Sequence, residues 1–331
     1  MSAPRVTLLT AVRNGARHIG STIHCALRQN FTDWEYIIVD DASTDQTVGI
    51  VAEFQRKDPR IHLVTRPVSG GPYIAANEGL RLARGKYIVR SDADDHFPSH
   101  RIERQLQFLE THPEYRSCVS YWRGFTDDKN PSRTVRVPSN SRVFRWELLL
   151  RAPSLHSAVC YERSAIEELG LYRELPLSQD YRLFCELARR DWLGVIPEVL
   201  CYVRFHATRQ TATNPTMQME LGLDVLSDHM IALTGERWSR ADLTALRAVG
   251  LSQRMPVDKG LELIDRWDRL WMAATDLTPQ DRDELGRTSA FRRWKHLRSN
   301  ARTQPVPVMM GLLKLATTKS QFLLPALREA R

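Results

Sequence analysis

The sequence has few cysteines and no long apolar run. Its five cysteines, an odd number, show no C-x-x-C spacing, which argues against both a disulfide framework and a zinc knuckle. The segment Met1 to Thr10 lacks the cationic start and the small-residue cleavage site of a signal peptide. The best candidate for a membrane span, Val306 to Leu313, falls short of the roughly 18 apolar residues required. We therefore expect reduced thiols in a cytoplasmic chain that does not cross a bilayer.

The sequence also lacks the biased composition of fibrous or disordered proteins. Its 331 residues include 16 glycines and 17 prolines, with 42% hydrophobic and 26% charged residues, which excludes collagen-like and globally disordered classes. This length predicts one large elaborated domain or two domains. The 47 Lys and Arg outnumber the 39 Asp and Glu, an excess that suits a nucleic acid, an anionic membrane or a phosphorylated substrate.

Short apolar runs alternate with helical windows over the first ninety or so residues. The expected strands are Arg5–Val12, Glu35–Val39, Ile61–Thr65 and Tyr87–Arg90. The expected helices between them are His18–Gln29, Thr44–Arg56 and Tyr73–Ala83. This order predicts an α/β fold with a buried, mostly parallel sheet and helices on both faces. Polar clusters follow the four strands, so we expect them to meet in one ligand crevice at the carboxyl ends.

The rest of the chain divides into a second α/β stretch and a helical region. We expect a mobile loop over Arg123–Asn140, because it is polar and rich in turn formers. The further elements expected are a strand over Ser157–Tyr161, a helix over Ser178–Arg190 and a strand over Glu198–Phe205. Helical spacing begins at Pro215, so the predicted domains are residues 1–214 and 215–331.

Two acidic clusters follow expected strands. In Asp92-Ala93-Asp94-Asp95, two carboxylates at i and i+2 of an extended chain would face the same side and share Mg²⁺ or Mn²⁺. A solvated turn is the alternative, and the position after a strand favours the ligand interpretation. Asp40-Asp41 can cap the next helix, accept hydrogen bonds from a base or ribose, or do both.

Several motifs together resemble the family 2 glycosyltransferases of the GT-A fold. The resemblance covers roughly residues 5 to 206 and rests on the segments Val6–Asn14, Val39–Asp45, Ala75–Gly79, Ala83–Ile88 and Asp92–Asp95. It implies an inverting transferase with a Rossmann-like sheet that uses a nucleoside-diphosphate sugar, most simply a uridine diphosphate sugar, and Mn²⁺ or Mg²⁺. The implied acceptor is a hydroxyl of a saccharide or lipid-linked saccharide in cell-surface polysaccharide synthesis.

The resemblance assigns donor-side roles to individual residues. The first loop, which borders the base, is matched by Ala11, Val12 and Asn14, and the base-binding acid by Asp40 or Asp41. Further donor-side matches are Asn77, Asp92 and Ala93, and the metal ligands would be Asp94 and His206. Arg13 stands where the family often has an aromatic residue. A guanidinium plane can still stack on a base, but this departure weakens the inference that the base is uracil.

The resemblance also assigns an acceptor side. Gln179-Asp180 resembles the family's Glu-Asp catalytic motif, with Asp180 as the general base. From the residues alone, Ser178 is an N-cap and Asp180 is a first-turn acid, as in many helices. His156 matches a less specific position near the acceptor, and His206 ends an Arg-x-His strand. Trp192 is either a core residue or an acceptor wall.

The basic excess is concentrated at the end of the sequence. Residues 287–331 contain ten Lys or Arg and one acidic residue, Glu329, interleaved with apolar residues. This mixture predicts either a helix on anionic lipid or an ordinary helix packed on the domain. A non-catalytic binding module is the second functional hypothesis. A nicotinamide-dependent dehydrogenase fails because no G-x-G-x-x-G follows the first strand, and nucleic-acid binding is disfavoured by the confined charge.

Overall fold

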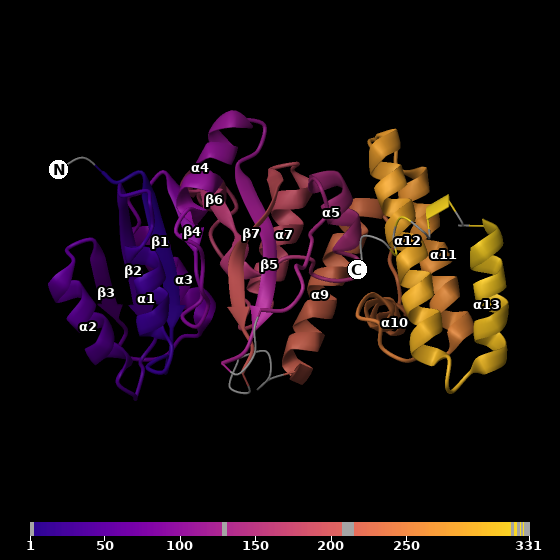
Figure 1. Cartoon of the computed structure of the whole chain (residues 1–331), viewed down its shortest axis with the longest axis horizontal. Coiled ribbons are helices and arrows are strands. Elements are labelled where there is room, and N and C mark those ends of the chain that lie inside the picture. The colour runs from indigo at the N-terminus through magenta and orange to yellow at the C-terminus, as the bar shows by residue number, and fades with distance from the viewer. Residues whose placement is uncertain are drawn as a thin grey trace. The chain divides into compact units, whose positions relative to one another are not determined.

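The computed structural model describes residues 3–127, 131–206, 215–318, 321–322, 325 and 327 (Figure 1). The chain forms two compact units, Met1–Ser141 with Pro153–Gly222, and Arg142–Ala152 with Leu223–Arg331. The predicted division after residue 214 differs from these units, because 142–152 joins the second unit and the first unit extends to 222. The composition shift at 208–214 lies outside the described residues.

The first unit is built on a seven-stranded sheet in the order β3-β2-β1-β4-β6-β5-β7. Its first four strands are parallel and are β1 (Val6–Val12), β2 (Trp34–Asp40), β3 (Ile61–Thr65) and β4 (Tyr87–Arg90). The short β6 (Cys160–Glu162) is antiparallel to β4 and to β5 (Ser117–Phe125), and β7 (Leu193–Arg204) is parallel to β5. The predicted mostly parallel α/β sheet is confirmed.

Helices cover both faces of this sheet. They are α1 (Ile19–Leu27), α2 (Thr47–Lys57), α3 (Pro72–Leu82), α4 (Arg101–Thr111), α6 (Arg163–Glu168) and α7 (Gln179–Arg189). The strands read as apolar runs because both faces are buried, and Val6, Leu8, Tyr36, Ile38 and Val89 form part of the core. α3 packs closely on β1, since a Cβ at Gly79 would lie 2.3 Å from the Leu9 Cδ1 atom.

Two expectations for the second half of this unit need correction. The expected strand over Ser157–Tyr161 is a 3₁₀ turn, η1 (His156–Ala158), followed by β6. The expected loop over Arg123–Asn140 begins with strand, because β7 pairs with Arg123–Phe125, and Val135 bridges Trp122. Residues 128–130 of that loop lie outside the described part. Finally, α4 and β5 were not predicted.

The second unit consists of helices. They are α5 (Ser141–Glu147), α9 (Pro215–Thr234), α10 (Arg240–Gly250), α11 (Val257–Ala273), α12 (Pro279–Asn300) and α13 (Pro305–Thr318). The first residue of α5, and α9 as far as Gly222, belong to the first unit. The helical prediction from Pro215 onward is thus confirmed. α12 begins with a capping box between Thr278 and Asp281. Within the described residues, no helix combines the length and apolar character that a bilayer crossing requires.

The basic stretch is not one surface tail. Its first part is the second half of α12, where Arg292 and Arg293 are buried and Arg293 pairs with Asp268 at 2.7 Å. Of the two predictions for the basic stretch, a helix on anionic lipid and a helix packed on the domain, the second is therefore correct for α12. α13 buries Val308 and Leu315 but exposes a run of apolar side chains. Lys319, Arg328 and Arg331 lie outside the described residues.

Candidate active site

The loop after β1 is fastened to the loop after β2. Asn14 has a left-handed backbone with φ of 53°, its N–H donates to Ser43 Oγ at 2.8 Å, and its Oδ1 accepts from the Thr44 N–H at 2.8 Å. Asparagine tolerates this conformation better than most residues. Of its predicted neighbours in the first loop, Val12 is buried, Ala11 is half-buried and Arg13 is exposed. The predicted first-loop residues therefore stand together at the carboxyl end of β1.

Asp40 and Asp41 differ in how many of their oxygens are occupied. Asp41 is buried, and four groups donate to its carboxylate: Arg66 Nε, Ser69 Oγ and the N–H groups of Gly70 and Gly71. Asp40 is also buried, and its Oδ2 accepts from the Ser43 N–H at 2.9 Å. Its Oδ1 has no hydrogen-bond partner in the described structure. A buried carboxylate oxygen requires a donor, so Asp40 rather than Asp41 is the candidate for binding a base or ribose.

The acidic cluster after β4 is a turn, not an extended segment. Residues 93–94 form the turn, and the Asp95 N–H approaches the Asp92 carbonyl. The i, i+2 argument for Asp92 and Asp94 is therefore wrong in detail. Asp95 is directed inward and is 2% exposed, and its Oδ1 accepts from the Arg204 N–H at 2.9 Å. Burial and the charges of Asp92 and Asp94 raise the pKa of Asp95 well above its usual value.

β7 brings a second set of polar side chains to the acidic turn. The Nε2 atom of His206 lies 2.7 Å from Asp94 Oδ2, and the ring of His18 lies 5.1 Å from that of His206. Arg204 donates from Nε to the Asp94 carbonyl and forms an ion pair with Asp127. Burial, and then the charges of Arg204 and His206, lower the pKa of His18. The predicted pair Asp94 and His206 is therefore brought together.

α7 begins with Gln179 and places Asp180 in its first turn. Ser178 is the N-cap by position, with φ of 63°, but its hydroxyl donates to the Gln218 carbonyl and does not cap the helix. The predicted capping role of Ser178 is thus wrong. Burial chiefly, with smaller contributions from the charges of Asp180 and Asp92 and against the effect of Arg90, raises the pKa of Tyr172 to about 12. Both carboxylates therefore lie close enough to act on the same buried hydroxyl.

The family follows from a comparison with known proteins. Residues 7–170 match the family model described as Glycosyl transferase family 2. Over these residues the chain belongs to glycosyltransferase family 2. The putative teichuronic acid biosynthesis glycosyltransferase TuaG of Bacillus subtilis (strain 168) is 36% identical over 123 residues, which are 37% of this chain and 47% of TuaG. The chondroitin synthase of Escherichia coli is 25% identical over 250 residues, 73% of this chain and 35% of that protein. The matched regions are therefore about half or less of these two relatives.

Solved glycosyltransferase structures share the fold. S. aureus TarS 1–349 in complex with UDP-GlcNAc has a TM-score of 0.59 at 14% identity, covering 89% of each chain. The mannosyltransferase PcManGT from Pyrobaculum calidifontis, in complex with GDP-Man and Mn²⁺, has a TM-score of 0.55 at 17% identity, covering 96% of this chain and 88% of that one. These likenesses show that the chain has the GT-A fold.

The metal that this family implies has two candidate protein ligands in the described residues. Asp94 Oδ2 and His206 Nε2 converge at 2.7 Å, and a carboxylate oxygen with a neutral imidazole suits Mn²⁺ or Mg²⁺. No group of three or more His, Cys, Asp or Glu side chains able to hold a metal occurs in the described part of the chain. The donor set thus fits a cation whose other ligands are substrate oxygens and water.

Three residues predicted for the transferase site have other surroundings. Asn77 bonds the backbone of Tyr172 through both Nδ2 and Oδ1, at 2.8 and 2.9 Å, so it anchors that segment. His156 is buried against Arg90 and Tyr172, so it lies behind the acidic turn and not on an acceptor surface. Trp192 precedes β7 at the sheet edge where β5 and β7 begin, opposite the crevice, so the acceptor-wall prediction is wrong.

Sequence reasoning missed four residues of the transferase site. Arg204 and Asp95 hold the acidic turn, and Arg90 and Tyr172 lie beside it. Two signals were present. A charged residue, Arg90, ends an otherwise apolar strand, and Arg204 is the arginine of the Arg-x-His motif. Neither signal says what the side chain contacts.

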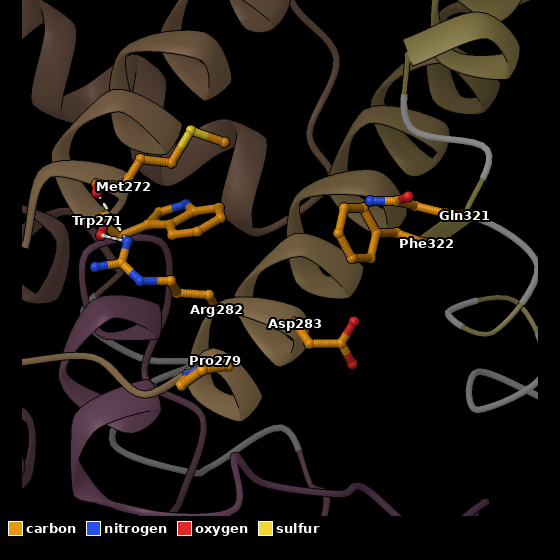
Figure 2. A pocket seen from close by; sticks show the side chains of 7 residues that line it. All are labelled: Trp271, Met272, Pro279, Arg282, Asp283, Gln321 and Phe322. Carbon is orange, nitrogen blue, oxygen red and sulfur yellow. Dashed lines mark hydrogen bonds between the residues drawn. The ribbon is translucent and has the colours of Figure 1, made fainter.

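The second unit of the transferase contains a separate hollow of about 770 Å³. Figure 2 shows Trp271 and Met272 of α11 on one side of it and Gln321 and Phe322 on the other. Arg282 donates to the carbonyl of Met272 at 2.8 Å, so its guanidinium is engaged in ending α11. The hollow does not include any of the candidate site residues.

Proposed function

We propose that the protein is an inverting, metal-dependent glycosyltransferase that moves a sugar from a nucleoside-diphosphate sugar to an acceptor hydroxyl. The observation that carries the proposal is the convergence of three acidic groups on one end of the sheet. Asp40 has a buried oxygen without a partner in the described structure, Asp94 Oδ2 meets His206 Nε2, and the charges of Asp180 and Asp92 both act on Tyr172. Asp40 suits the base or ribose, Asp94 with His206 suits the metal-bound diphosphate, and Asp180 suits the acceptor hydroxyl.

The donor side is supported by the fastened loops after β1 and β2. Ala11, Val12 and Asn14 lie at the end of β1 beside β2, whose last residue, Asp40, keeps an unpartnered acceptor, Oδ1, which suits an N–H or O–H of the nucleoside. The TarS complex holds a uridine nucleotide and the PcManGT complex a guanosine nucleotide. We propose a uridine diphosphate sugar as the donor, with Arg13 stacking on the base.

The proposed reaction is one displacement at the anomeric carbon. Asp180 accepts the proton of the acceptor hydroxyl while the oxygen of that hydroxyl bonds to the anomeric carbon. The bond from the anomeric carbon to the diphosphate oxygen breaks. The nucleoside diphosphate leaves with the electron pair, so the configuration inverts. A bound divalent cation would stabilise negative charge on the diphosphate, and Asp94 and His206 would hold it. Gln179 replaces the family's Glu without removing the proton acceptor.

Asp180→Asn tests this assignment. We expect transfer to fall by about 10² to 10⁴ while binding of the donor stays within about twofold, because the variant loses the base but keeps the donor pocket. Donor hydrolysis or transfer would be followed with uridine and guanosine diphosphate sugars, and donor affinity by calorimetry with and without Mn²⁺. Asp94→Ala is the comparison, because it should weaken metal-dependent donor binding.

Two results would count against the proposal. Turnover above about a tenth of wild type in Asp180→Asn would remove this residue from the base role. Equal wild-type donor affinity with and without Mn²⁺ would contradict the metal assignment. Tight donor binding without any turnover in the wild type would instead favour a non-catalytic binding module.

We also propose that α13 contacts the anionic inner face of a cell membrane, where a lipid-linked saccharide acceptor resides. α13 packs on α12 closely, since a Cβ at Gly311 would lie 2.5 Å from the Leu297 Cδ2 atom. Its outer face exposes Met309, Met310, Leu312 and Leu313 to between 43% and 65%. α13 carries Lys314 and no acidic residue, which favours anionic lipid over a second copy bearing the same charge.

Leu313→Glu tests the membrane contact. We expect the wild type to float with phosphatidylglycerol vesicles and Leu313→Glu to float at least tenfold less, since it puts a carboxylate on the apolar face. Leu251→Glu, at another exposed leucine of the second unit, is the matched control and should float like wild type. Failure of the wild type to float, or equal loss in both variants, would contradict the proposal.

A further inference from the structure

β4 ends in a positive charge that the sheet buries. Arg90 is 3% exposed, its Nη1 donates to the Leu9 carbonyl at 2.8 Å, and its Nε donates to His156 Nε2 at 3.2 Å. Its Nη2 lies 3.8 Å from Asp92 Oδ1. An arginine stays protonated when buried, so the fold keeps a fixed cation directly behind the acidic turn. Such a group is costly to bury unless several partners hold it.

His156 links this cation to Tyr172. Its Nε2 atom lies 2.5 Å from the Tyr172 hydroxyl. Burial and then the charge of Arg90 hold the pKa of His156 well below its usual value, and because the Arg90 Nε–H donates to His156 Nε2, this nitrogen is an acceptor. Tyr172 therefore donates its hydroxyl hydrogen to His156 and accepts a hydrogen bond from Tyr161 at 3.0 Å.

Tyr172 is the anchored end of a strained connection to α7. Its backbone is held at both N–H and carbonyl by Asn77. Leu171 and Ser178, on either side of the connection, have φ values of 66° and 63°. A left-handed conformation costs a non-glycine residue about 1–2 kcal/mol, so it persists only where the surrounding contacts impose it. The Tyr172 contacts therefore help to determine where α7 starts.

We propose that Tyr172 is a positioning residue for Asp180. Its hydroxyl bonds His156, which in turn bonds Arg90, and these contacts fix the start of α7, which carries Asp180, relative to Asp92. This inference rests on the proposed function, because it gives the position of Asp180 a consequence for transfer. Rates of reactions between held groups are sensitive to placement, and a displacement of about 1 Å can cost up to about 10²-fold. Three buried side chains, Arg90, His156 and Tyr172, thus connect the donor-side turn to the segment that leads into α7.

Tyr172→Phe and Tyr161→Phe form a matched pair for testing this. Both remove one buried hydroxyl from the same cluster, but only Tyr172 bonds His156. We expect kcat to fall about tenfold in Tyr172→Phe with the donor KM changed less than about twofold, because placement and not donor binding is altered. We expect Tyr161→Phe to keep kcat within about twofold of wild type.

A second measurement does not depend on turnover. Amide hydrogen exchange over residues 179–183, the first turn of α7, should be at least about threefold faster in Tyr172→Phe than in wild type or Tyr161→Phe. Wild-type kcat in Tyr172→Phe, equal kcat losses in the two variants, or unchanged exchange would each overturn the proposal. If the wild type transfers no sugar, the proposed function fails, and the exchange comparison still decides whether Tyr172 positions α7.

Discussion

Two acidic turns lie at the carboxyl end of the same sheet, and they shift the pKa of a buried carboxylate in opposite directions. After β2, burial raises the pKa of Asp41, but hydrogen bonds and the Arg66 charge outweigh it and leave the pKa below its usual value. After β4, Asp95 is equally buried beside Asp92 and Asp94, and its pKa is raised. The fold thus favours the charged form of one acid and penalises that of the other.

In each turn, a second carboxylate is left for other chemistry. Beside the saturated Asp41, Asp40 keeps one buried oxygen without a partner in the described structure. Beside the inward Asp95, Asp94 meets His206 at the surface of the turn. An acid whose oxygens are filled by its own chain holds a loop in place, whereas its neighbour can receive a ligand. Exposure alone does not separate these roles, because Asp40 and Asp41 are 2% and 3% exposed.

The largest expected effect is on stability, in Asp41→Asn. The amide can accept through one oxygen only, so it leaves some of the four donors to Asp41, such as Ser69 Oγ and the Gly71 N–H, without an acceptor, while Arg66 keeps its ion pair with Glu78. Each buried donor left unsatisfied costs about 1–3 kcal/mol, so we expect a loss of about 3 kcal/mol in the free energy of unfolding. Urea denaturation would measure the loss. The control is Asp40→Asn, which keeps an acceptor for Ser43 and should cost less than about 1 kcal/mol; equal losses would end the contrast.

The same pair makes a smaller, pH-dependent prediction. Because the folded pKa of Asp41 lies below its unfolded value, its stabilisation is fully present above the unfolded pKa of about 3.9 and is lost as pH falls through the folded pKa. The difference in unfolding free energy between wild type and Asp41→Asn should therefore be constant from pH 7 to 5 and narrow below about pH 4. Urea titrations at pH 7, 5 and 3.5 test this, and a gap that does not narrow would contradict it.

The first half of the fold could be predicted because its signals are local. The run Tyr87–Arg90 is buried throughout, as a central parallel strand must be, and the bounds of this strand and of Ile61–Thr65 agree with the structure. The second half of the sheet could not be predicted well, because its strands form only through pairing with neighbouring strands. β6 has only three residues and exists through pairing with β4 and β5, while Arg123–Phe125 looks like loop until β7 is beside it. Pairing of this kind overrides local propensity.

For the candidate site, the motifs identified acids that the structure places at the carboxyl end of the sheet, but they did not reveal the contacts of these acids. The sequence placed Asp40 and Asp41 side by side and left the base-binding acid open between them. Which carboxylate is free depends on donors such as Ser69 and Gly70, contributed by the loop after β3. Trp192 was misplaced because a position after a helix in sequence does not reveal which end of a strand it faces.

The finest test of the contrast between Asp40 and Asp41 is the affinity for the nucleoside itself. Asp40→Asn keeps an acceptor for the Ser43 N–H and replaces the unpartnered Oδ1 by an amide N–H₂ group, so a ligand donor loses its partner. We expect uridine diphosphate to bind about tenfold more weakly by calorimetry, since a hydrogen bond to a charged group contributes about 1.5 kcal/mol. Asp33→Asn, an exposed acid before the start of β2, removes the same charge at the opposite edge and should leave affinity unchanged. Tighter binding in Asp40→Asn would mean that the pocket receives a carbonyl and not a donor, and would assign the base contact elsewhere.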